Sequence, residues 1–110
     1  MYIYNITFVT SHDKEYELLD YLKKYLLPLL FNPQSPAANP ELRKVVEIAS
    51  EKPDADHGVS IALSVSFASE VSAHSWHDTS LLPALEEFNQ RFGSRALYFL
   101  TLLQSLPLDA

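Results

Sequence analysis

The residues from Val59 to Phe67 constrain the fold more than any other part of the chain. Large apolar side chains alternate strictly with small ones, the large set being Val59, Ile61, Leu63, Val65 and Phe67. The small set is Ser60, Ala62, Ser64 and Ser66. A period of two is the spacing of side chains on opposite faces of a β-strand. The pattern therefore predicts a strand with one bulky apolar face and one face of small side chains.

Two further stretches predict helices. Residues 12–30 carry leucines at three- and four-residue steps, which places one apolar stripe along a helix. We expect this helix to bend or end near Pro28, because proline lacks an amide hydrogen and clashes with the preceding turn. Residues 69–92 predict a second helix, with a break at 78–80 ahead of Pro83, where the apolar spacing changes frame.

Both ends of the chain predict strands. Residues 2–9 are rich in tyrosine, isoleucine, threonine, phenylalanine and valine, which favour strands. Residues 95–106 place apolar side chains on both sides of a strand. We therefore expect this last strand to be covered on both faces.

The stretch 42–50 is ambiguous. Some of its apolar residues match helical spacing, whereas the short run Lys44-Val45-Val46-Glu47-Ile48 is β-branched, as a strand would be. Periodicity alone does not separate these alternatives, and we expect a strand. A loop with several prolines is predicted at 32–40, and turn residues follow at 52–58.

The predicted order of elements is β-α-β-β-α-β, which is the order of the ferredoxin-like α+β fold with an antiparallel sheet. The 110 residues leave room for a single domain, 1–110. Both helices then cover one sheet face, and the face of small side chains is left to solvent or to a partner. We expect a homodimer with Ser60 and Ser66 in its interface, because two-fold dimers are the commonest oligomers. A solvated serine-rich face is the alternative.

Trp76 lies beside two histidines in the second predicted helix. Because tryptophan is enriched at interfaces, we place it there or against a ligand, and burial in the core is an equal alternative on size alone. His74, His77 and Asp78 share one helical face. A catalytic zinc usually needs three ligands of suitable geometry, and no H-E-x-x-H motif is present. A solvated helix face is therefore favoured over a metal site.

The balance of residue types argues against several functions. Acidic residues outnumber basic ones by 14 to 8, and the lysines and arginines are scattered, so nucleic-acid binding is not expected. The absence of cysteine excludes disulfides, zinc thiolates and thiol nucleophiles. The N-terminus lacks a signal-peptide pattern, and the longest apolar stretch is too short to span a bilayer. We therefore expect a cytoplasmic protein without membrane contact.

Several short motifs are shared with a known family. They are Ile3-Tyr4-Asn5 followed by Thr7, Pro28 near the end of the first helix, Phe92-Gly93, and Phe99-Leu100-Thr101-x-Leu103. On these motifs the chain resembles a family of short bacterial proteins that form a domain of unknown function and are grouped with the dimeric α+β barrels. The resemblance implies a strand at 43–50 and two sheets paired into a barrel. Leu26 departs from the family pattern, which has a histidine at that position, and the following loop is longer than usual.

Uncharged polar residues are expected to gather on the inner sheet face. Asn5, Thr7, Ser64 and Thr101 are predicted to share this face, with Arg43 or Lys44 at its edge. Convergent polar groups around an apolar cavity suit a small organic ligand, and the alternative is that they are hydrogen-bonded filling between packed sheets. The chain has no G-x-S-x-G motif, which argues against a serine nucleophile, and only two glycines, which argues against a phosphate-binding loop. No catalytic set, metal or cofactor is expected.

Two functions remain open. The first is a non-catalytic homodimeric module that binds a small ligand or another protein. The alternative is a cofactor-free enzyme acting on a small molecule, monooxygenase- or isomerase-like, which depends on analogy of fold. A closed apolar cavity with His57, His74 or Arg43 pointing inward would favour the enzyme.

Overall fold

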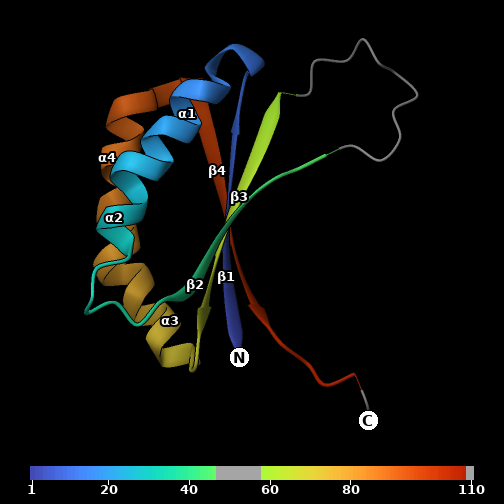
Figure 1. Ribbon diagram of the computed structural model, residues 1–110. Helices are drawn as coiled ribbons and strands as arrows, with labels where there is room; N and C mark the ends of the chain where they lie inside the picture. Colours follow the sequence, from blue (N-terminus) through green and yellow to red (C-terminus); the bar gives the residue numbers. More distant parts are fainter. Residues whose placement is uncertain (47–57, 109–110) are drawn as a thin grey trace.

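The computed structural model describes residues 1–46 and 58–108, in which one sheet is backed by helices. The four strands are antiparallel and lie in the order β2-β3-β1-β4. Their bounds are Tyr2–Thr10 for β1, Ala38–Lys44 for β2, Val59–Phe67 for β3 and Ala96–Gln104 for β4. Figure 1 shows the helices α1 to α4 on one side of this sheet. The expected ferredoxin-like α+β fold is therefore confirmed.

Each helical stretch is continuous but changes its hydrogen-bonding pattern in the middle. The first stretch joins α1 (Glu15–Tyr21), a π-helical segment (Leu22–Leu26) and α2 (Leu27–Leu30). The second joins α3 (Glu70–Trp76), a π-helical segment (His77–Leu81) and α4 (Leu82–Phe92). Short 3-10 turns, His12–Lys14 and Gly93–Arg95, precede α1 and follow α4.

A proline just after each π-helical segment accounts for it. The N–H of Leu27, which precedes Pro28, bonds to the carbonyl of Leu22, five residues back. The equivalent bond precedes Pro83 in the second stretch. Proline removes one backbone donor and clashes with the turn before it, and a wider π turn relieves that clash. The second helix therefore does not break at 78–80 as expected, but continues through the proline.

The alternation in β3 decides which sheet face is buried. β3 pairs with β1 so that Leu63 lies opposite Ile6 and Ile61 lies opposite Phe8. These side chains are at most 1% exposed beneath the helices. Full burial of an aliphatic or aromatic side chain of this size stabilises a fold by about 1.5–3 kcal/mol. The core between sheet and helices includes the large side chains of Trp76, Phe8, Phe67, Phe88 and Phe92.

The ambiguous stretch contributes a strand that begins earlier than expected. β2 starts at Ala38, inside the predicted loop, and its pairing with β3 shifts in register between Ala38 and Glu41. Asn39 adopts a φ of +51° within this bulge, and Pro40 follows it. Proline is tolerated at a bulge or on an edge strand, because it cannot donate to the ladder. Most of the predicted strand beyond 46 lies outside the described residues.

The last strand is not covered on both faces within one chain. Leu97, Phe99 and Leu103 are 58%, 59% and 51% exposed. The opposite side of β4 packs against the core through Tyr98, Leu100 and Leu102. Among residues 1–46 and 58–108, no element covers this exposed side of β4.

Candidate functional site

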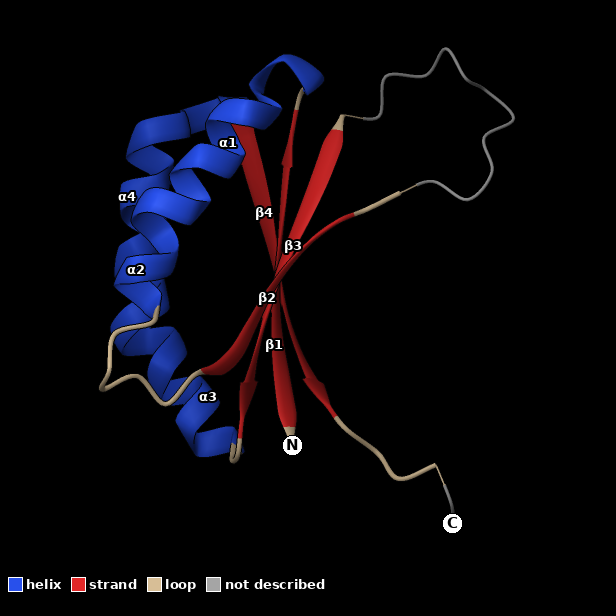
Figure 2. Ribbon diagram, in the orientation of Figure 1, coloured by secondary structure: helices blue, strands red, loops and turns tan. Residues whose placement is uncertain are grey.

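The helices leave one face of the sheet open (Figure 2). By the strand register, this face carries every residue predicted to bind a ligand. Across the sheet, Ser64 lies opposite Asn5, which lies opposite Thr101. Thr7 is two positions along the same strand, and its hydroxyl accepts from the Asn5 amide at 2.9 Å. Arg43 on β2 donates to the Ser64 hydroxyl at 3.0 Å. We call this set the polar row.

The polar row has hydrogen-bonding capacity but no group that titrates near neutral pH. Asparagine, serine and threonine side chains are uncharged, and arginine stays protonated. Arg43 also forms an ion pair with the Glu41 carboxylate on the same strand. The polar row therefore offers hydrogen-bond donors and acceptors, and the carboxylate beside it is that of Glu41.

Bulky apolar side chains occupy the β4 side of the open face, and small ones occupy the β3 side. Leu97, Phe99 and Leu103 project from β4, while Ser60 and Ser66, predicted as interface residues, lie across β1 from them. Single exposed apolar residues are ordinary on a protein surface. Large contiguous apolar patches, in contrast, are typical of interaction surfaces.

Trp76, the third residue predicted at an interface, lies in the core. It is 1% exposed and packs edge-on against Tyr4 at 5.5 Å between ring centroids, and against Phe67 at 5.2 Å. Burial, the other alternative from the sequence, is what the structure shows. The prediction fails here because a helix face turned toward the core takes the largest side chain for its packing area.

The two histidines of the second helix contact different partners. His74 lies 3.4 Å from the Glu70 carboxylate on the exposed side, whereas His77 faces the sheet and contacts Tyr4. Within residues 1–46 and 58–108, no group of three histidine or acidic side chains could hold a metal ion. His57 lies outside the described residues.

Tyr4 and His77 form a polar contact on the helix side of the sheet. The Tyr4 hydroxyl lies 2.5 Å from Nδ1 of His77, and the rings are stacked with centroids 5.7 Å apart. Burial, and secondarily the negative charge of Asp78, raises the pKa of Tyr4 above its usual value of 10.0. Its hydroxyl therefore keeps its proton at neutral pH. No pattern in the sequence indicates this pair, because only the packing of the second helix on β1 brings the residues together.

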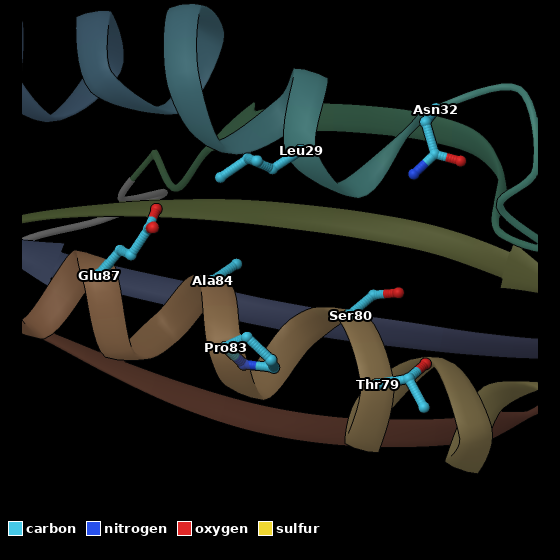
Figure 3. Close-up of a pocket in the computed structure, with 7 residues that line it drawn as sticks. All are labelled: Leu29, Asn32, Thr79, Ser80, Pro83, Ala84 and Glu87. Carbon is cyan, nitrogen blue, oxygen red and sulfur yellow. The ribbon is translucent and has the colours of Figure 1, made fainter.

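A groove of about 260 Å³ runs between the two helical stretches. It is lined by Leu29 and Asn32 from one side, and by Thr79, Ser80, Pro83, Ala84 and Glu87 from the other (Figure 3). None of the residues predicted to bind a ligand contributes to it. This groove is open along its length, so it is not the closed cavity that would favour an enzyme.

Solved structures of similar shape share the architecture of this chain. An ethyl tert-butyl ether d (EthD) family protein from Bacillus halodurans aligns with a TM-score of 0.62 at 11% identity, over 96% of this chain and 100% of that one. Rv0793 from Mycobacterium tuberculosis aligns at 0.60 and 14% identity over 100% of both chains. At3g17210 from Arabidopsis thaliana aligns at 0.55 and 18% identity, over 96% and 99%. At these identities the likeness shows the fold alone.

Within this fold class, the chain belongs to the family described as a domain of unknown function (DUF4286), whose profile matches residues 1–106. The family resemblance expected from the sequence motifs is thereby confirmed. Comparison with curated proteins finds no match. None of the helices in the described ranges is long and apolar enough to cross a membrane.

Proposed function

We propose that this chain acts as a homodimeric binding module in which two open sheet faces pack together and enclose a small molecule. The proposal depends on the shape of the open face. Leu97, Phe99 and Leu103 are exposed on β4, and the small side chains of β3 lie across β1 from them. A two-fold axis running along the strands places the bulky β4 side of one copy over the small β3 side of the other. Packed sheets lie about 10 Å apart, so large side chains over small ones fill the gap evenly.

The polar row supplies the contacts to the ligand. Small-molecule sites are mainly apolar and carry a few placed polar groups, which matches a row of amide and hydroxyl groups flanked by apolar side chains. The hydroxyl of Thr101 loses its water when a second sheet covers it. A buried hydroxyl without a partner costs about 1–3 kcal/mol, and a bound ligand removes that cost.

Light scattering at micromolar concentration tests the dimer. We expect the mass of two chains for the wild type and of one chain for Phe99→Glu, because the new carboxylate would be buried between the sheets. Tyr16→Glu is the matched control, since Tyr16 is 81% exposed on α1 and lies on the helix side. A single-chain mass for the wild type would overturn the proposal.

Native mass spectrometry of the protein as purified tests the ligand. We expect a dimer that carries an added small mass, and we expect Asn5→Val to lose that mass while remaining a dimer. Asn89→Val, on the exposed surface of α4, is the control and should keep it. A wild-type dimer with no added mass would contradict the ligand-binding part of the proposal.

A second candidate function, a cofactor-free catalyst for a small molecule, is supported by the Tyr4–His77 pair. A buried phenol held against an imidazole can donate or accept a proton, which is the work of general acid–base catalysis. The test is incubation with a mixture of small metabolites followed by mass spectrometry. Consumption that Tyr4→Phe abolishes and Tyr16→Phe retains would support an enzyme, and no consumption by the wild type would remove this candidate.

A further inference from the structure

We propose that the groove between the two helical stretches binds small aliphatic amines that carry a hydrogen-bond acceptor at their far end. The groove lies among the helices, on the side of the sheet opposite the open face (Figures 1 and 3). A dimer formed through the open face leaves it accessible. The inference is therefore independent of the homodimer and of the ligand enclosed between the sheets.

Glu87 gives one end of the groove its preference for a cation. Its carboxylate turns toward the first helical stretch in Figure 3. Among the residues described, no ion pair engages Glu87, and Arg91, one turn further on, lies over the Tyr21 ring at 5.9 Å. An ionised carboxylate only accepts hydrogen bonds, so a protonated amine is a matching partner.

Asn32 gives the other end a donor. Its side-chain oxygen already accepts from the N–H of Gln34 at 3.0 Å, which leaves the amide NH₂ group to donate. Figure 3 shows the Asn32 nitrogen on the groove side and its oxygen turned away. Thr79, across the groove, uses its hydroxyl proton on the Ser75 carbonyl at 2.8 Å. A hydroxyl or carbonyl oxygen on the ligand can therefore accept from the Asn32 amide, and the Ser80 hydroxyl lines the same end of the groove.

The middle of the groove is apolar and of defined length. Leu29, Pro83 and Ala84 line it between the two polar ends. Thr79 and Ser80 lie toward the Asn32 end of the groove in Figure 3, and the helix rises by about 10 Å from Ser80 to Glu87. An extended chain of about six carbons therefore reaches along the groove from Glu87 toward Asn32. The π-helical segment before Pro83 contributes Thr79 and Ser80 to the groove lining, and such segments occur often at functional sites.

Titration with 6-amino-1-hexanol, followed by backbone amide NMR, tests the proposal. We expect saturable shifts confined to Leu29, Asn32 and residues 79–87. The diol 1,6-hexanediol has the same chain without the charge, and we expect it to bind at least about tenfold more weakly, as the loss of one charge-assisted hydrogen bond does.

The variant Glu87→Gln separates this site from general attraction to an acidic protein. We expect it to weaken binding of 6-amino-1-hexanol by about tenfold, while Glu86→Gln, which removes the same charge outside the groove, leaves it unchanged. Equal shifts with the diol, equal effects of the two variants, or no saturable shift would each overturn the assignment. The measurement here is an NMR shift and not the mass of the protein. A negative result would therefore not contradict the proposed homodimer.

Discussion

The hydroxyl of Tyr4 lies 2.5 Å from Nδ1 of His77 and ties the first strand to the π-helical segment of the second helix. The residues are 73 positions apart in the sequence. Tyr4 is 5% exposed as a whole residue, and the contact of its hydroxyl with His77 is partly buried. The contact therefore satisfies a buried donor and fixes where the second helix sits on the sheet.

Removing the imidazole should destabilise the fold more than its position on a helix surface suggests. We expect His77→Leu to lower the free energy of unfolding by about 1–3 kcal/mol, because the Tyr4 hydroxyl is left buried and unpaired. His74→Leu is the matched control and should change it by less than about 0.5 kcal/mol, because His74 forms an exposed pair with Glu70. Urea unfolding followed by Trp76 fluorescence measures both, and equal effects would contradict the role of the pair.

Stability should fall at high pH through Tyr4. Burial raises its pKa above 10.0, so the folded state holds this proton more tightly than the unfolded state. The stabilisation is therefore complete below about pH 10 and is lost as the pH rises through the folded pKa. Unfolding curves between neutral pH and pH 11 should show a shallower decline for Tyr4→Phe than for the wild type. Tyr16→Phe, at an exposed position, should keep the wild-type decline.

The two glycines should respond differently to alanine. A Cβ on Gly58, whose φ is +72°, would lie 2.6 Å from the backbone oxygen of Thr10, whereas one on Gly93, whose φ is +56°, meets no atom within 4 Å. Gly93→Ala should cost about 1–3 kcal/mol from backbone strain alone. Gly58→Ala should cost more, because the chain must also move away from a carbonyl. Thermal unfolding of the two variants gives the ranking, and the reverse order would show that the Gly58 contact relaxes freely.

A large apolar side chain on the β3 side of the open face should prevent the proposed dimer without adding charge. Ala62 lies on β3 opposite Thr7, which in turn lies opposite Phe99. We expect Ala62→Phe to prevent close approach of a second sheet and to give a single-chain mass, while Ala62→Ser keeps the dimer. Circular dichroism should show that both variants remain folded. A dimeric Ala62→Phe would mean that the chains associate through another surface.

The order of elements could be predicted from the sequence because the buried side chains of each strand or helix recur at a regular spacing. Residues 59–67, in which large and small side chains alternate strictly, form β3, and the large residues are at most 2% exposed. The amphipathic residues 12–30 form the first helical stretch and the short 3-10 turn before it. In both, one face packs on the core, so the spacing of apolar residues follows the geometry of the element.

The remaining features depend on contacts between distant residues. Most side chains of β2 are exposed, so no periodic spacing of apolar residues in the sequence marks its start at Ala38. The size of Trp76 alone does not indicate whether its face of the helix turns toward the core or toward an interface. The polar row could be grouped from strand alternation, whereas the Tyr4–His77 contact and the groove at Glu87 required the packing of the helices.

The two edges of the sheet are protected unequally. β2 is interrupted by Pro40 and a bulge and carries Arg43 and Lys44, which discourage pairing with another strand. β4, the other edge, has neither proline nor charge from Ala96 to Gln104. A long apolar edge is a template for strand addition and aggregation. Variants that prevent the proposed dimer should therefore precipitate when concentrated, so that assembly would also serve to keep the protein in solution.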